Sequence, residues 1–309
     1  MNEFISYLKK YCSAISPLDF LLTTLFTGLL ILINYSLGLE KAIRSILSLL
    51  LGYIVFVLFF LSVYSTAWML QYRRAAWLPA AGKKQFILLV IAAALLFSGK
   101  MMLWPSPAWI QRAFSFPWDQ YWARILQAPV KLLGMVFFLW MIWKFLYPGQ
   151  TFFGCSLTGF KAAPYFKMLL LVIPLILWAS GRPDFLHSYP KYQAVAFING
   201  SAHPAWPWRL LYELSYGMDF ISIELFFRGF LVLGFIRFAG MKAILPMAAF
   251  YCTIHFGKPL AECISSYFGG LILGVIVYHT RSIYGGLIVH LGLAWMMEIG
   301  GYAGHLLCN

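Results

Sequence analysis

The sequence predicts an all-α protein, a polytopic membrane helix bundle with about eight or nine transmembrane helices. Of its 309 residues, 62% are hydrophobic and only 11% are charged, and the mean hydropathy is +0.79. Repeated apolar runs of about 20 residues match the thickness of a bilayer and exceed what a water-soluble domain needs. The runs are continuous rather than alternating, which is typical of helices and excludes a transmembrane β-barrel.

The elements follow in order from these runs. Residues 1–16 are predicted to form a short amphipathic or interfacial segment. The predicted spans are 18–38, 45–70, 85–104, 130–147, 167–180, 210–236, 243–256, 260–279 and 283–304. The run at 167–180 is short and contains Pro174, so we expect a kinked or partly re-entrant helix there. The run at 243–256 is short as well, which makes eight spans the alternative to nine.

The formal net charge of +13 could indicate nucleic-acid binding, but the positions of the charges favour a membrane function. Lys and Arg lie mostly in short connections between apolar runs, where they contact headgroups and fix topology. We therefore expect the lipid bilayer, and no nucleic acid, as a partner. A weak excess of these cations favours a cytoplasmic N-terminus, and we expect the inner (cell) membrane of a bacterium. The five cysteines are odd in number and lack a Cys-x-x-Cys, so we expect no disulfide framework.

Two regions are predicted along the chain. Residues 1–208 form an N-terminal multi-span region with two aromatic-rich interfacial loops, 105–128 and 181–209. Residues 209–309 are predicted to form a core of four helices, which contains the residues that the catalytic hypothesis below uses. The Trp and Pro content of the loops is typical of an aromatic belt at the membrane interface, which is the interpretation we favour. A lid that guides a substrate segment toward the core is the alternative.

One predicted helix carries several ionisable residues at membrane depth, where such groups are costly and indicate a functional site. It contains Glu213, Asp219, Glu224 and Arg228. In an α-helix Glu224 and Arg228 share a face, because they are four residues apart. A structural ion pair that joins helices is the simplest alternative to a catalytic role.

Two histidines follow within the next apolar runs. His255 closes one run, and His290 lies inside the last one, eight residues before Glu298. Each histidine alone is more often structural than catalytic. A carboxylate and two imidazoles in a shielded cavity, however, can remove a proton from water and stabilise the oxyanion of a tetrahedral intermediate. The combined pattern therefore predicts hydrolysis of an amide. Gly285, Gly286 and Gly292 permit close helix approach beside His290.

At these residues the sequence resembles the CPBP family, also called the Abi or CAAX protease family, which includes the Ras-converting CAAX endopeptidases. The Glu-Glu-x-x-x-Arg motif corresponds to I-E-L-F-F-R-G, residues 223–229. The Phe-x-x-x-His motif corresponds to Y-C-T-I-H, residues 251–255, and His-x-x-x-Asn/Asp corresponds to H-L-G-L-A, residues 290–294. The resemblance covers about residues 210–300 and implies a glutamate-dependent intramembrane endopeptidase.

Two departures from the family motifs leave alternatives open. Ile223 stands where the family has the glutamate credited as the base, and Ala294 stands where it has an oxyanion-stabilising Asn. Glu224 could serve as the carboxylate, or Asp219 or Glu298 could substitute for the missing acid. The third alternative is a catalytically inactive relative, a membrane scaffold or immunity-type protein with the same fold.

The resulting hypothesis is an intramembrane endopeptidase that cleaves a membrane-anchored peptide or protein. Glu224 would be the base, His255 its partner, His290 the oxyanion donor and Arg228 a positioning charge. No cofactor or metal is expected, since the family is described as metal-independent. Zinc held by two His and one Glu is the less favoured alternative.

Overall fold

The computed structural model describes residues 2–46, 48–72, 80–102, 108–201 and 204–308. These residues are largely helical and include no strand, which confirms the predicted all-α membrane bundle. They form two compact units, each assembled from separate parts of the chain. Unit 1 comprises Met1–Leu103, Ile142–Thr158 and Leu225–Ile283, and unit 2 comprises Trp104–Met141, Gly159–Glu224 and Tyr284–Asn309. Each unit contains residues from both predicted regions, 1–208 and 209–309.

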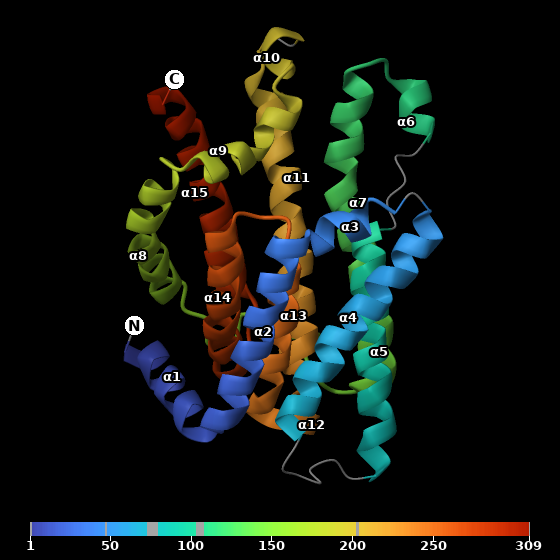
Figure 1. Cartoon of the computed structure of the whole chain (residues 1–309), viewed down its shortest axis with the longest axis vertical. Helices are drawn as coiled ribbons and strands as arrows, with labels where there is room; N and C mark the ends of the chain where they lie inside the picture. Colours follow the sequence, from blue (N-terminus) through green and yellow to red (C-terminus); the bar gives the residue numbers. More distant parts are fainter. Residues whose placement is uncertain (1, 47, 73–79, 103–107, 202–203, 309) are drawn as a thin grey trace. The chain divides into compact units, whose positions relative to one another are not determined.

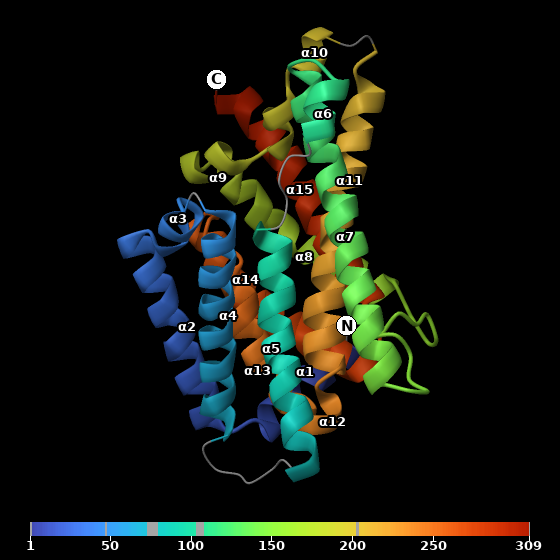
Figure 2. The ribbon, with the colours of Figure 1, turned by 90° about the vertical axis from the view of Figure 1, so that its right-hand side faces the viewer.

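The elements of unit 1 are mostly long helices (Figure 1). They are α1 (Asn2–Ala14), α2 (Pro17–Leu37), α3 (Leu39–Arg44), α4 (Leu49–Tyr72), α5 (Ala80–Met102), η2 (Leu225–Leu233), α12 (Ile236–Ala239), η3 (Gly240–Ala243), α13 (Ile244–Thr253) and α14 (Leu260–Thr280). Figure 2 shows α2, α4 and α5 as successive neighbours in a row.

The elements of unit 2 include the two helices that carry Glu224 and His290. They are α6 (Ala108–Ala113), the first part of α7 (Trp118–Leu146), α8 (Ala163–Ala179), α9 (Pro183–Ser188), η1 (Lys191–Val195), α10 (Ile198–Ser201), α11 (Trp206–Glu224) and α15 (Tyr284–Cys308). Helix α15 packs against α8 and α11, as Figure 1 shows.

Each predicted span falls on a helix or on consecutive helical segments. Five helices are long and apolar enough to cross a membrane on their own, namely α2, α4, α5, α7 and α14. The count becomes six if α8 and residues 183–201 form one broken span, since these two segments meet at 101°. The bend lies after Ala179 rather than at Pro174, which stays inside α8. The predicted number of eight or nine spans remains a prediction.

The core of unit 1 is formed by α13, whose ten residues are all buried. Phe250 of α13 contacts Phe60 of α4, Phe97 of α5, and Phe226 and Phe227 of η2, with ring centroids 4.9–6.0 Å apart. Lipid is as apolar as these rings, so close dispersion contacts rather than exclusion of water hold such helices together. This complete enclosure explains why a helix as short as α13 is stable.

The segment η2 is a π-helix, although the sequence was expected to continue as an α-helix. Its wider turn is visible in the bond from the Gly234 N–H to the Gly229 carbonyl oxygen, 3.0 Å long and five residues back. An ideal Cβ at Gly229 would lie 2.7 Å from the Phe153 carbonyl oxygen, so only glycine allows this approach. The spacing argument for Glu224 and Arg228 assumed an α-helix throughout, and that premise is wrong from Leu225 onward.

The two aromatic-rich loops of the sequence contribute to one aromatic cluster in unit 2. Trp118 contacts Trp208 at 5.0 Å between ring centroids, and the Tyr121 hydroxyl donates to the Trp208 carbonyl oxygen at 2.7 Å. The buried residues of the cluster are Tyr121, Ile125, Val195, Ile198 and Tyr212. These contacts join the two loops to each other. Other aromatic residues of the loops stay on the surface, and Trp109 and Trp206 are more than half exposed. Their predicted roles as belt or lid remain predictions.

Candidate active site

Glu224 and His290, two of the predicted catalytic residues, are in direct contact within unit 2. Glu224 is the last residue of α11 and is fully buried. Its carboxylate Oε1 lies 2.8 Å from Nδ1 of His290 on α15. The His290 side chain is only 13% exposed. The structure thus forms a buried carboxylate–imidazole pair from residues that are 66 positions apart in the sequence.

The pair depends on a glycine of the facing helix. Gly286 lies four residues, one helical turn, before His290, and an ideal Cβ at this position would overlap Oε2 of Glu224. The carboxylate therefore occupies the space that any larger residue at position 286 would fill. Phe220 of α11 packs on the His290 ring with centroids 5.0 Å apart, which is a second contact between α11 and this imidazole.

This geometry has a direct chemical consequence. A neutral imidazole that donates its Nδ1–H to a carboxylate presents a lone pair at Nε2. Nε2 of His290 can then accept a proton, and the Glu224 carboxylate stabilises the imidazolium that results. The tautomer is assigned from the hydrogen bond.

In unit 1, His255 and Arg228 both contact Tyr251. His255 Nδ1 lies 3.1 Å from the Tyr251 carbonyl oxygen, and the two rings are 4.8 Å apart. The guanidinium of the fully buried Arg228 lies 4.2 Å from the centroid of the same ring. A cation over an aromatic face is attracted by the ring quadrupole, more strongly where water is excluded. Tyr251 therefore joins two of the predicted residues, a role that its place in the motif at four residues before His255 could have indicated.

The turn that follows His255 is fixed by the end of α2. The side-chain amide of the buried Asn34 donates to the Phe256 carbonyl oxygen at 2.9 Å and accepts from the Glu40 N–H at 2.9 Å. The Tyr35 hydroxyl donates to the Lys258 carbonyl oxygen. This contribution of α2 was not predicted from the sequence, because a single Asn in an apolar run does not show which distant residue it contacts.

The two auxiliary acids have different surroundings. Both carboxylate oxygens of the buried Glu298 accept backbone N–H groups, from Lys191 at 2.7 Å and from Tyr192 at 3.2 Å. These bonds satisfy orphan donors at the start of η1, so Glu298 has a structural task. Asp219 lines a pocket between α11 and α7. Ile223 and Ala294, the two departures from the family motifs, are both buried.

Within the part of the chain that the structure describes, no three His, Cys, Asp or Glu side chains are grouped to hold a metal ion. The zinc alternative and the expectation of no cofactor both stay predictions.

The comparison with known families agrees with the motif reading. Residues 204–296 match the family described as type II CAAX prenyl endopeptidase Rce1-like. No curated protein and no solved structure matches the chain significantly. The matched segment starts before α11 and ends inside α15, and it includes Glu224, Arg228, His255 and His290. The family match therefore supports the assignment of this multi-pass membrane protein to the CPBP, or CAAX protease, family of intramembrane proteases.

Proposed function

We propose that the protein is an intramembrane endopeptidase that hydrolyses a peptide bond of a membrane-associated protein through water activated by Glu224 and His290. The observation that carries the proposal is the 2.8 Å contact between the buried Glu224 carboxylate and His290 Nδ1. The pair lies inside the segment that matches the endopeptidase family. The buried site has a low dielectric constant, which strengthens the attraction between the carboxylate and a protonated imidazole. The carboxylate therefore favours proton transfer from water to the imidazole.

The contact favours a division of roles that differs from the sequence-based hypothesis, in which His290 was the oxyanion donor. In the first step, Nε2 of His290 removes a proton from water as the water oxygen bonds to the scissile carbonyl carbon and the carbonyl electron pair moves to oxygen. Glu224 stabilises the imidazolium. In the second step, the C–N bond breaks and the imidazolium returns its proton to the leaving nitrogen. His255 remains the predicted second imidazole, and Arg228 the predicted positioning charge.

The test is cleavage of a membrane-anchored fluorogenic peptide by the purified protein in liposomes. We expect Glu224→Gln and His290→Ala each to lower turnover by about 10²-fold or more, which is the usual contribution of general acid–base catalysis. Glu213→Gln on α11 and His305→Ala on α15 are matched controls on the same two helices and should keep most of the activity. Turnover that persists in both Glu224→Gln and His290→Ala would refute the proposal.

A second candidate function, an inactive membrane scaffold or immunity-type protein, is favoured by the motif departures. Ile223 and Ala294 are apolar and can supply neither a carboxylate nor an amide donor. The discriminating measurement is the cellular phenotype of a strain that carries Glu224→Gln at the normal expression level. A phenotype that survives this substitution supports the scaffold, and a phenotype that is lost supports the protease.

A further inference from the structure

Two buried cysteines of unit 1 face each other where α13 ends and α14 begins. Cys252 lies in the last turn of α13, and Cys263 lies in the first turn of α14. Both are free thiols, both are fully buried, and their Sγ atoms lie 3.8 Å apart. The Cys252 thiol donates to the Cys263 carbonyl oxygen at 3.4 Å, and Cys263 Sγ lies 3.8 Å from the Cys252 carbonyl oxygen. Each thiol is therefore held beside the other by the backbone of the facing helix.

Close helix packing brings this pair together. The two cysteines are eleven residues apart, and no Cys-x-x-Cys motif marks them in the sequence. An ideal Cβ at Gly270 of α14 would lie 3.0 Å from Tyr251 of α13. At Gly274 it would lie 2.7 Å from Met247. These glycines let α14 approach α13 closely, and the approach places the two Sγ atoms within reach of each other.

The pair encloses the turn that carries His255. The His255 N–H donates to the Cys252 carbonyl oxygen at 3.0 Å, and the Lys258 N–H donates to the His255 carbonyl oxygen at 3.0 Å. The Asn34 amide also holds this turn, through the Phe256 carbonyl oxygen. A covalent bond between the two Sγ atoms would close a ring that contains the whole turn, and it would add a covalent connection to these hydrogen bonds.

We propose that Cys252 and Cys263 form a redox-active dithiol, which hydrogen peroxide converts into a disulfide that fastens the His255 turn to both helices. One thiol loses its proton and attacks a peroxide oxygen, the O–O bond breaks, and the hydroxide that leaves takes up that proton as water. The product is a sulfenic acid. The second thiol attacks the sulfenic sulfur, the S–O bond breaks, and the hydroxyl leaves with the thiol proton as a second water.

The geometry favours a disulfide over deeper oxidation. The Sγ atoms must approach from 3.8 Å to a bond length of about 2.0 Å, which small side-chain rotations achieve. The second thiol is already in place, so it captures the sulfenic acid before another peroxide molecule reacts. The pair also lies close to the surface, since Gly257 and Ile264 are exposed. A small oxidant can therefore reach the thiols when the turn opens locally.

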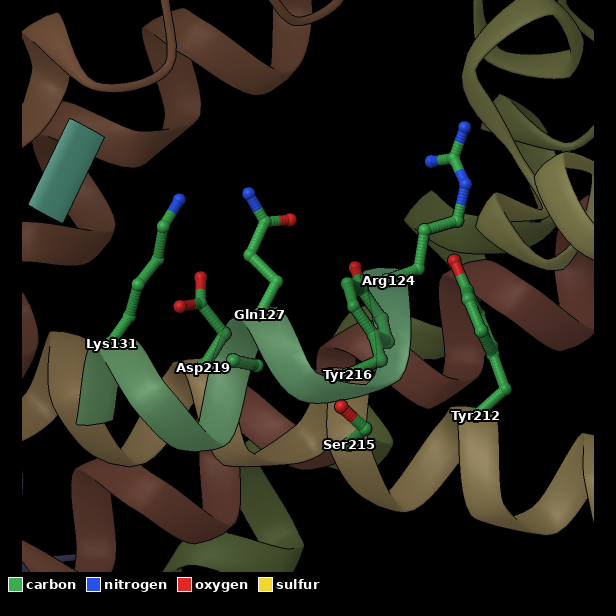
Figure 3. Close-up of a pocket in the computed structure, with 8 residues that line it drawn as sticks. Arg124, Gln127, Lys131, Tyr212, Ser215, Tyr216 and Asp219 are labelled. Carbon is green, nitrogen blue, oxygen red and sulfur yellow. The ribbon is translucent and has the colours of Figure 1, made fainter. Parts of the chain in front are cut away.

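The proposal goes beyond the proposed hydrolysis and does not depend on it. The dithiol belongs to unit 1, whereas the Glu224–His290 contact and the pocket in Figure 3 belong to unit 2. A disulfide lowers the entropy of the open states of the ring that it closes, so it makes local opening of the turn rarer. The predicted modification is therefore measured without a substrate, by thiol labelling and by hydrogen exchange.

The test uses the full-length protein in nanodiscs, with Cys12, Cys155 and Cys308 changed to Ser so that only the pair reacts. The folded protein is treated with hydrogen peroxide, then unfolded in detergent and labelled with a polymer-linked maleimide that shifts the gel band once for each free thiol. We expect two shifts before treatment, none after it, and two again after reduction with dithiothreitol. Digestion and mass spectrometry should find Cys252 and Cys263 in one cross-linked product.

A second measurement follows the turn itself. Hydrogen exchange of the His255 and Lys258 backbone N–H groups should slow by about tenfold or more after oxidation. Exchange within α5 is the internal control and should not change. Cys252→Ala and Cys263→Ala each remove one partner, so peroxide should not slow exchange in either variant. If one of these variants folds poorly, the other supplies the same comparison.

Three results would overturn the proposal. One is a folded protein in which both thiols are still labelled after peroxide treatment. Another is a loss of labelling that dithiothreitol does not reverse, which would show a sulfinic acid in place of a disulfide. The third is a disulfide that forms but leaves hydrogen exchange at His255 and Lys258 unchanged.

Discussion

At the scale of single residues, the proposed chemistry depends on Glu224, and neighbouring residues determine the surroundings of its carboxylate. His290 Nδ1 faces its Oε1, and Gly286 leaves room for its Oε2. A carboxylate at a helix end in an apolar bundle is stable only with such partners. Ile223 replaces the first glutamate of the family motif. Helix α11 still ends in a carboxylate, because Glu224 is the next residue.

Gly286→Ala tests the space beside the carboxylate. The new Cβ would overlap Glu224 Oε2, so we expect the carboxylate to shift and kcat to fall about tenfold or more, with a smaller change in KM. Gly269→Ala in α14 is the matched control, since its Cβ would meet nothing within 4 Å. Equal kcat values for Gly286→Ala and Gly269→Ala would contradict this description of the site. Both kinetic constants are measured with the same liposome assay.

Asn34→Ala tests the support of the His255 turn. It removes a donor to Phe256 and an acceptor for Glu40, so we expect a loss of about 1–3 kcal/mol in the free energy of unfolding. Tyr35→Phe removes only the bond to Lys258 on the same turn and should cost less. Thermal unfolding in detergent ranks the stability of the two variants. A larger loss of stability in Tyr35→Phe than in Asn34→Ala would contradict the role of Asn34 as the main support of the turn.

At the scale of elements, η2 shows where sequence reasoning succeeds and where it ends. The apolar runs locate the helices well because lipid forces each span to satisfy its own backbone, so hydropathy alone predicts them. The π-helix at Leu225–Leu233 has no such indication, and the residue that approaches Gly229 within it, Phe153, comes from a distant part of the chain. The pairing of Glu224 with His290 escaped prediction for the same reason. Motif resemblance named both residues, but only the helix packing shows that they touch.

Gly229→Ala tests the π-helix. The added methyl group would lie 2.7 Å from the Phe153 carbonyl oxygen, so either η2 or the Phe153 segment must move. We expect overpacking to cost about 1–3 kcal/mol in the free energy of unfolding. Gly28→Ala in α2 is the control, because nothing lies within 4 Å of its Cβ, and it should be neutral or slightly stabilising. A neutral Gly229→Ala would show that the close approach does not constrain the segment.

At the scale of the whole molecule, the number of spans determines the topology. The two compact units alternate along the chain, so insertion into the membrane must bring together segments that are far apart in sequence. Five or six helices pass a test of length and hydropathy, whereas α13 is shorter and α11 and η2 carry charges. Such helices cross the membrane only if the bundle shields them.

Tags at both ends of the chain test the span count. Nine spans place the N-terminus and C-terminus on opposite sides of the membrane, and eight place them on the same side. With the N-terminus in the cytoplasm, as the Lys and Arg distribution favours, we expect a C-terminal tag to be accessible from outside. Protease protection of each tag in intact and opened cells gives the answer, and protection of both tags in intact cells would favour eight spans.

The most direct test of the central claim is a double-mutant cycle on Glu224 and His290. Cleavage by the purified protein, Glu224→Gln, His290→Ala and the double variant is compared in the liposome assay. If the two residues act as one unit, the double variant is no slower than the slower single variant. Rate losses that multiply in the double variant would contradict a shared catalytic role for the pair.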